Sequence, residues 1–342
     1  MTSAEPLVSP PAGLVDLAAA RLGGVAVIAN DEFFAEKENL LKAEPAIFIP
    51  DKYTDRGKWM DGWESRRRRT PGHDWCVVQL GLRGVIKQVD IDTSHFLGNH
   101  PPFASLDAVS LTTRFPSNVD EIEGLPWNSI LTKSPLNPGS QNLFPIDSET
   151  AWTHVRLNII PDGGVARLRI YGVVVPDWSK VKPGELVDLV AIQNGGVPLA
   201  CSDMFFSHMN NLIMPGRSEN MGDGWETKRR RGPGYDWIIL KLGRSGAIRK
   251  IEVDTNHFKG NYPDTCLIEA CAAPNAGIDE RTSSQVHWSE ILPMTKLQAH
   301  TQHFFERELS PMPNCTHLRL NIYPDGGVSR LRAWAIPDLT NE

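Results

Sequence analysis

The sequence predicts an all-β protein in which two homologous β-sandwich domains of the jelly-roll type follow one another. Two observations lead to this prediction. The 342-residue chain contains one pattern twice. Within each copy the apolar residues form short runs, about one per ten residues, which favours a sandwich or jelly roll over an α/β fold. Helical patterns are weak, the best being residues 33–41 and 205–212.

The duplication is clearest around two tryptophan-bounded, arginine-rich stretches. "DGWESRRRRTPGHDW" begins at Asp61 and "DGWETKRRRGPGYDW" begins at Asp223. Residues 61–101 align without a gap on residues 223–263, and about half of the positions are identical. Two homologous domains in tandem explain such a long match.

Two further segments recur in the same order. "DEFFAEKENLL" matches "DMFFSHMNNLI", and "HVRLNIIPDGGVARLR" matches "HLRLNIYPDGGVSRLR". The first copy carries an insertion, "IFIPDKYTDRG", before its arginine-rich stretch, and "VPDWSKVKPGE" joins the copies. We therefore place the first domain at residues 1–178 and the second at residues 179–342.

Each copy contains the same succession of predicted strands. "WCVVQLG" and "WIILKLG" are apolar, β-branched runs that end on glycine. "IKQVDIDTSHF" alternates, with Val89, Ile91 and Thr93 on one side, and the strand is expected to end near the threonine. "HVRLNIIPDGGVARLRIY" reads as a hairpin, because Pro-Asp-Gly-Gly supplies a turn between two alternating runs.

Composition narrows the class of protein. The formal net charge is -6 and the sequence pI is about 5.9, which argues against a nucleic-acid partner. Five cysteines form no C-x-x-C pair and are odd in number, which favours reduced thiols. We find no signal-peptide pattern and no apolar run of about 18 residues. A cytoplasmic protein without a membrane partner is expected.

The repeated motifs resemble those of one known family. D-G-W-E-[ST]-x-R, then D-W-x-x-x-x-L-G, is similar to the front half of galactose-binding-like jelly rolls. "GWESRRRR" with "DIDTSHFLGNHP", repeated as "GWETKRRR" with "VDTNHFKGNYP", resembles the allantoicase family over nearly the whole chain. The resemblance implies a homo-oligomeric hydrolase of C–N bonds other than peptide bonds, which converts allantoate to ureidoglycolate and urea in purine breakdown.

The arginine run is the first candidate site. Side chains alternate along a strand, so four consecutive arginines cannot all face one pocket. Arginine binds a carboxylate through two parallel hydrogen bonds, which suits the carboxylate of allantoate. We expect one arginine of each copy, Arg67 and Arg229, to bind substrate. The other interpretation is that the arginines pair with acids such as Glu64 and Asp74 and brace the fold.

The histidine and glutamate of the motifs are candidate catalytic groups. His95 and His257 each follow a predicted strand end, where loops and sites gather. With Glu64 and Glu226 they are suited to general acid–base catalysis. Asn99 and Asn261 are expected to bind a ureido group. The alternatives are that each histidine caps a turn and that each glutamate pairs with an arginine.

A second polar cluster follows from the last strands of each copy. Alternation puts Arg156 on the polar side with His154 and Asn158, and Arg319 on the equivalent side in the second copy. This side is either a solvated outer face or an anion-binding surface, and we list Arg156 and Arg319 as substrate-binding candidates. Metal dependence stays open, although Asp92 and His95 are possible ligands of a divalent metal.

The sequence leaves two alternative functions to weigh, and it leaves open which copy carries the active site. A non-enzymatic pair of carbohydrate-binding jelly rolls is the main alternative, and the unpaired cysteines count against it. A nucleic-acid protein conflicts with the acidic balance. The copies differ at His73 against Tyr235 and at His100 against Tyr262, so the sequence does not decide which copy is active.

Overall fold

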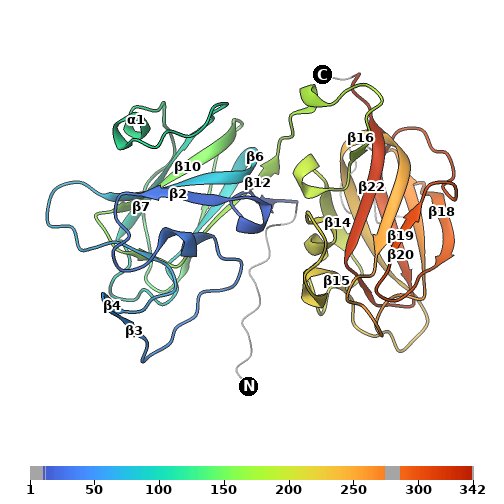
Figure 1. Ribbon diagram of the computed structural model, residues 1–342, viewed down its shortest axis with the longest axis horizontal. Helices are drawn as coiled ribbons and strands as arrows, with labels where there is room; N and C mark the ends of the chain where they lie inside the picture. Colours follow the sequence, from blue (N-terminus) through green and yellow to red (C-terminus); the bar gives the residue numbers. More distant parts are fainter. Residues whose placement is uncertain (1–10, 12, 274–285, 341–342) are drawn as a thin grey trace. The chain divides into compact units, whose positions relative to one another are not determined.

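The computed structural model describes residue 11 and residues 13–273 and 286–340 (Figure 1). The chain divides into two compact units between Val175 and Pro176. The boundary expected from the sequence, after residue 178, falls in the short 3-10 helix η3 (Trp178–Lys180) that follows this division. Each unit is built almost entirely of β-strands, as predicted.

The described residues of unit 1 form twelve strands. They are β1 (Val15–Asp16), β2 (Val25–Ala29), β3 (Tyr53–Thr54), β4 (Gly57–Lys58), β5 (Trp63–Glu64), β6 (Asp74–Asp92), β7 (Phe103–Val109), β8 (Asn128–Pro135), β9 (Gln141–Pro145), β10 (Ala151–Ile160), β11 (Gly164–Val165) and β12 (Arg167–Val174). Its helices are η1 (Ala20–Leu22), η2 (Lys37–Leu41) and α1 (Val119–Glu123).

Unit 2 repeats this order. Its strands are β13 (Val187–Asp188), β14 (Val197–Cys201), β15 (Trp225–Glu226), β16 (Asp236–Asp254), β17 (Thr265–Cys271), β18 (Ser289–Lys296), β19 (Gln302–Phe305), β20 (Cys315–Tyr323), β21 (Gly327–Val328) and β22 (Arg330–Pro337). Its 3-10 helices in the described residues are η3, given above, η4 (Ile192–Asn194), η5 (Met209–Ile213) and η6 (Met221–Asp223). No helix in the described parts of the chain is long and apolar enough to cross a membrane.

One long strand organises each unit. The first half of β6 lies between β2 and β10, and its second half lies between β9 and β12. The sequence predicted two separate strands here, but residues 74–92 form one strand that belongs to both layers of the sandwich. In unit 2, β16 has the same role between β14, β20, β19 and β22.

The predicted hairpin at the end of each copy is wrong. β10 pairs with β6 and β7, whereas β12 pairs with β6 and β1, and the described residues show no pairing between β10 and β12. The Pro-Asp-Gly-Gly segment is an arch that carries the chain from one layer to the other. Its first peptide bond, Ile160–Pro161, is cis, and so is Tyr323–Pro324 in unit 2.

Alternation along β10 is confirmed on the core side, where Val155, Leu157 and Ile159 are fully buried. The opposite side is not a solvated outer face, which was one of its two interpretations. His154 is only 5% exposed and Asn158 only 4%. The connection between β7 and β8 covers this face: its Phe115, Ile122 and Trp127 pack with Trp75 and Val77 of β6.

Candidate functional site

A carboxyl–amide pair lies at the loop end of each unit. Asn99 Nδ2 donates a hydrogen bond to Glu64 Oε1 at 2.7 Å. Asn261 Nδ2 donates to Glu226 Oε1 at 2.5 Å. The structure therefore brings together two of the residue types that the sequence suggested for catalysis and substrate binding, and it does so in both repeats.

Three chain segments hold Glu64 in place. Its backbone pairs with Gly164 in β11 and forms a bridge with Ala35. The carbonyl oxygen of Asn99 accepts a hydrogen bond from Gly164 N at 2.8 Å. The glutamate and its asparagine are thus fixed to the same arch, although they lie far apart in the sequence.

The arch requires glycine at position 163. Its φ is +141°, and a Cβ there would lie 2.6 Å from Pro101 N and 2.8 Å from Asn99 O. Only a residue without a side chain allows the arch to approach the loop that carries Asn99 so closely.

The electrostatic environment of the glutamates suits proton transfer. Burial raises the pKa of Glu64, and the hydrogen bond from Asn99 opposes this only in part. Burial also raises the pKa of Glu226 against the bond from Asn261. No cation is among the groups that shift either pKa, so the interpretation of these glutamates as arginine partners is not supported. A carboxyl group in such a site exchanges a proton closer to neutral pH.

The arginine run separates into two groups. Strand pairing is limited to Trp63–Glu64 in this stretch. Beyond it, every second side chain, that of Arg66 and that of Arg68, is bonded to an acid. Arg66 Nε donates to Asp31 at 2.7 Å, and Arg68 Nη1 donates to the buried Asp74 at 2.6 Å. In unit 2, Arg230 Nη2 donates to Asp236 at 2.5 Å. These residues brace the fold.

The other arginines are exposed. No hydrogen bond, ion pair or ring contact within the described parts of the chain involves them. They are Arg67 and Arg69 in unit 1, and Arg229 and Arg231 in unit 2. They lie three and five residues after the glutamate of each unit, and their guanidinium groups are available for an anion.

The two motif histidines occupy special backbone positions. His95 has φ +70° and His257 has φ +69°, in the left-handed region that few residues other than glycine adopt. Nε2 of His95 lies 2.9 Å from the carbonyl oxygen of Ala46, and Nε2 of His257 lies 2.9 Å from that of Ser218. A carbonyl is an acceptor, so Nε2 carries the proton and Nδ1 is the unprotonated nitrogen when the ring is neutral.

Arg156, on the covered face of unit 1, and its counterpart Arg319 in unit 2 contact acids of the neighbouring strand. Arg156 Nη2 is 2.9 Å from Asp107 Oδ2, and its guanidinium group lies over the Trp127 ring. Arg319 Nε is 2.6 Å from Glu269 Oε2. These ion pairs already occupy the two arginines, and their contacts are with this face rather than with the Glu–Asn pairs.

Sequence reasoning missed the aspartate of the arch. Asp162 Oδ2 accepts a hydrogen bond from Arg68 N at 2.8 Å, and Asp325 Oδ2 accepts one from Arg230 N at 2.9 Å. These bonds fix the arginine loop to the arch in both units. The repetition of Pro-Asp-Gly-Gly was the available signal, but we interpreted it only as a turn.

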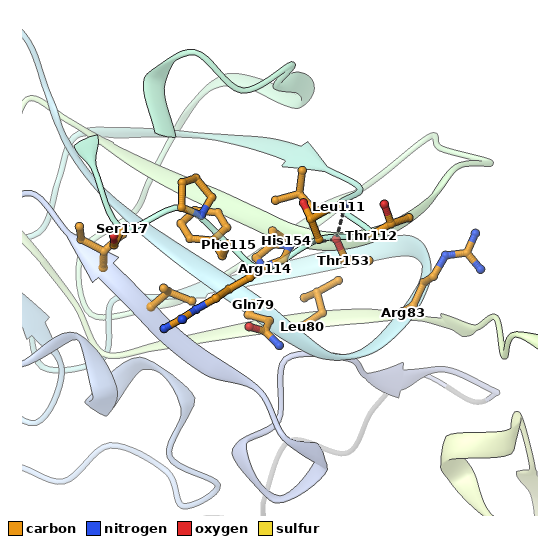
Figure 2. Close-up of a pocket in the computed structure, with 14 residues that line it drawn as sticks. Gln79, Leu80, Arg83, Leu111, Thr112, Arg114, Phe115, Ser117, Thr153 and His154 are labelled. Atoms are coloured by element: carbon orange, nitrogen blue, oxygen red, sulfur yellow. Dashed lines mark hydrogen bonds between the residues drawn. The ribbon is translucent and has the colours of Figure 1, made fainter. Parts of the chain in front are cut away.

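A separate cavity of about 800 Å³ lies on the covered face of unit 1. Figure 2 shows its lining, which includes Gln79, Arg114, Phe115 and His154. Burial lowers the pKa of His154 to about 4, and its Nε2 has no hydrogen-bond partner. That nitrogen is also inaccessible to solvent, so a molecule in the cavity does not reach it.

The described residues do not gather a metal site. No group of three or more His, Cys, Asp or Glu side chains among residues 13–273 and 286–340 is placed to hold a metal ion. Asp92 Oδ1 accepts from Ser94 N at 2.7 Å, and His95 Nε2 is directed to a backbone carbonyl. The suggested Asp92–His95 ligand pair therefore finds no third ligand in this part of the chain.

The fold and the candidate site define the class: a duplicated jelly-roll protein with a carboxyl–amide pair and exposed arginines in each repeat. The family model of the allantoicase repeat matches residues 15–175 and 187–338. The chain belongs to the allantoicase family.

Individual relatives agree with this assignment. The chain is 51% identical over 326 residues to a probable allantoicase of Pseudomonas aeruginosa, covering 95% of this chain and 96% of that one. It is 50% identical over 330 residues to the allantoicase of Dictyostelium discoideum, covering 95% and 88%. The crystal structure of Saccharomyces cerevisiae allantoicase superposes with a TM-score of 0.79 at 36% identity, covering 95% of this chain and 93% of that one.

Proposed function

We propose that this protein hydrolyses allantoate to ureidoglycolate and urea at its Glu–Asn pairs. The observation that supports this site is the environment of the two glutamates. Burial raises the pKa of each, and no cation pairs with either one among the described residues. Such a carboxyl group can give a proton to a leaving nitrogen and then accept one from water. The carbohydrate-binding alternative has no comparable support.

The proposed reaction has two steps. Glu64, in its protonated form, gives its proton to one ureido nitrogen as the bond between that nitrogen and the central carbon breaks, so urea leaves. The remaining ureido nitrogen supplies electrons to the central carbon and forms an imine-like intermediate. The Glu64 carboxylate then takes a proton from a water molecule while the oxygen of that water bonds to the central carbon. The product is ureidoglycolate.

The remaining candidates have binding roles in this proposal. Arg67 and Arg229 are exposed and unpartnered among the described residues, so they are available to bind the substrate carboxylate. Asn99 uses Nδ2 to hold Glu64, which leaves its Oδ1 to accept from a ureido N–H. His95 and His257 present Nδ1 as a second acceptor. Arg156 and Arg319, already paired with acids, stay secondary candidates.

The experiment measures urea release from allantoate by the purified, chelator-treated protein, with and without added divalent metal. We expect release by the wild type and a loss of about 10²–10⁴-fold in kcat when the operative general acid is replaced by its amide. Glu64→Gln, Glu226→Gln and the double variant assign the repeat, and His95→Ala and His257→Ala test the histidines. A wild type that releases no urea under any of these conditions contradicts the proposal.

We also propose a cytoplasmic location and a homo-oligomeric assembly. None of the five cysteines forms a disulfide in the part of the chain that the structure describes, as expected for a reducing compartment. Unit 2 exposes Met204, Phe205 and Phe206 at 42%, 69% and 62%, an apolar group of the kind that subunit contacts cover. Light scattering coupled to size exclusion tests the assembly, and a monomer at micromolar concentration would contradict it.

A further inference from the structure

The amide groups of the two Glu–Asn pairs differ in what their second hydrogen meets. The side-chain nitrogen of asparagine carries two hydrogens, and in each repeat one of them is donated to the glutamate. The other hydrogen of Asn99 has no acceptor in the described parts of the chain. In repeat 2 a methionine occupies this place, because Met221 Sδ lies 3.9 Å from Asn261 Nδ2. The amide of repeat 1 therefore has a hydrogen left for a ligand, whereas that of repeat 2 faces a thioether.

The backbone next to Met221 is firmly attached. Asn256 Nδ2 and His257 Nε2 both donate to the carbonyl oxygen of Ser218, at 3.1 and 2.9 Å. Three residues further on, Met221 begins η6, and its own carbonyl oxygen accepts a hydrogen bond from Gly224 N at 3.0 Å. The segment that carries the thioether is thus held by the motif histidine of repeat 2 on one side and by η6 on the other.

Repeat 1 has a different side chain at the equivalent position. Trp59 is the counterpart of Met221, since each lies two residues before the D-G-W-E motif of its repeat. The Trp59 ring is in contact with its own segment, where Lys52 Nζ lies 3.7 Å from the ring centroid. Among the described residues no hydrogen bond joins Trp59 to Asn99. The contact of Met221 with the asparagine is therefore specific to repeat 2.

The exposure of the amide and histidine groups agrees with this difference. Asn99 and His95 of repeat 1 are exposed, whereas Asn261 and His257 of repeat 2 are half-buried. Met221 itself is 45% exposed, so its side chain lies at the surface beside the repeat 2 amide. A substrate that approaches from solvent can reach the amide of repeat 1 directly, but in repeat 2 it meets the methionine.

We propose that Met221 caps the Glu–Asn pair of repeat 2 and keeps allantoate out, so that the pair of repeat 1 binds and converts the substrate. This inference rests on the proposed function. The cap acts through the volume of the methionine side chain rather than through the strength of its contact, because a thioether is a weak acceptor. Each chain then has one open site, and shortening the side chain of residue 221 opens the second.

Equilibrium dialysis with allantoate counts the open sites. The protein is the full-length Glu64→Gln/Glu226→Gln variant, which binds substrate without converting it and keeps an oxygen acceptor for each asparagine. We expect one allantoate bound per chain, and two per chain after Met221→Ala is added. Met221→Leu keeps the volume of the side chain without its sulfur, so one allantoate per chain is expected for this variant.

Urea release gives a second readout. Glu64→Gln removes the proposed acid of the open site, and adding Met221→Ala is expected to recover activity through Glu226. We expect a gain of roughly tenfold over Glu64→Gln alone, the effect of one hydrogen bond regained by the substrate. Met294→Ala is the matched control, because Met294 in β18 is a methionine of the same unit that is 57% exposed, and no gain is expected from it.

The outcomes separate the two proposals. The same number of bound allantoate molecules before and after Met221→Ala overturns the cap, and so does an equal gain from Met294→Ala. Urea release that is kept in Glu64→Gln but lost in Glu226→Gln also overturns it and leaves the proposed function standing. A wild type without urea release refutes the proposed function instead. If the double glutamine variant binds no allantoate, the comparison of urea release decides.

Discussion

Adjacent arginines of one run have opposite roles, and this is the clearest lesson at the scale of single residues. Arg68 is bonded to a buried aspartate, whereas Arg67 is exposed and has no partner in the described chain. The alternation of an extended backbone explains the difference, since consecutive side chains point to opposite sides. The sequence predicted that the run would divide, and contacts show which member belongs to which side.

Arg67→Ala and Arg68→Ala should therefore have different effects. Removing Arg67 leaves stability unchanged and raises KM for allantoate roughly tenfold or more, because a hydrogen bond to a charged group contributes about 1.5–3 kcal/mol. Removing Arg68 leaves the buried Asp74 with Asn30 as its side-chain partner and costs about 1–3 kcal/mol of stability. Thermal unfolding and Michaelis kinetics on both variants check this. Equal changes in Tm would contradict it.

His154 should make unit 1 sensitive to acid. Its pKa is about 4 in the folded protein against an ordinary value of 6.5, because burial disfavours the imidazolium. Its contribution to stability is complete above pH 6.5 and is lost as the pH falls towards 4, a change of about 3 kcal/mol. We expect the Tm of His154→Phe to fall less than that of the wild type between pH 6.5 and 4. Parallel curves would show that His154 does not titrate on unfolding.

At the scale of elements, the arch between β10 and β12 is the decisive connection. It joins the two layers, receives β5 through β11, and holds the loop of Asn99. The sequence predicted a hairpin, because two alternating runs around a Pro-Gly turn look the same whether the strands share a layer or not. Register with β6, which no local pattern encodes, separates the two possibilities.

Gly163→Ala should damage both the fold and the site. A Cβ at φ +141° and within 3 Å of Pro101 N and Asn99 O costs about 3 kcal/mol or more in strain and displacement. Asn99 is then displaced from Glu64, so kcat falls as well. Gly98→Ala is the control, because a Cβ there meets nothing within 4 Å. Calorimetry with urea-release assays on both variants checks this, and similar behaviour of the two would contradict the role of the arch.

At the scale of the whole molecule, the duplication yields two compact units that each have a core of their own. Leu157 in β10 and Leu320 in β20 are fully buried counterparts on the inner faces. The unit is therefore the natural level at which to consider stability.

Leu157→Ala and Leu320→Ala should each destabilise their own unit by about 2–5 kcal/mol, because the truncation leaves a cavity. In calorimetry we expect one transition to move down and separate from the other, and a different one to move in each variant. A single sharp transition that shifts equally in both variants would show instead that the units unfold together.

The sequence by itself determined the duplication, the all-β class, the family and the residue types of the candidate site, because these depend on repeated motifs and on the period of apolar residues. Only the tertiary structure decided that Asn99 bonds to Glu64 and that the face of His154 is covered. It also decided that Arg56 bonds to Phe33 and Ala46 to His95. These are contacts between segments far apart along the chain, brought together by the pairing with β6 and by the arch, and local patterns carry no record of them.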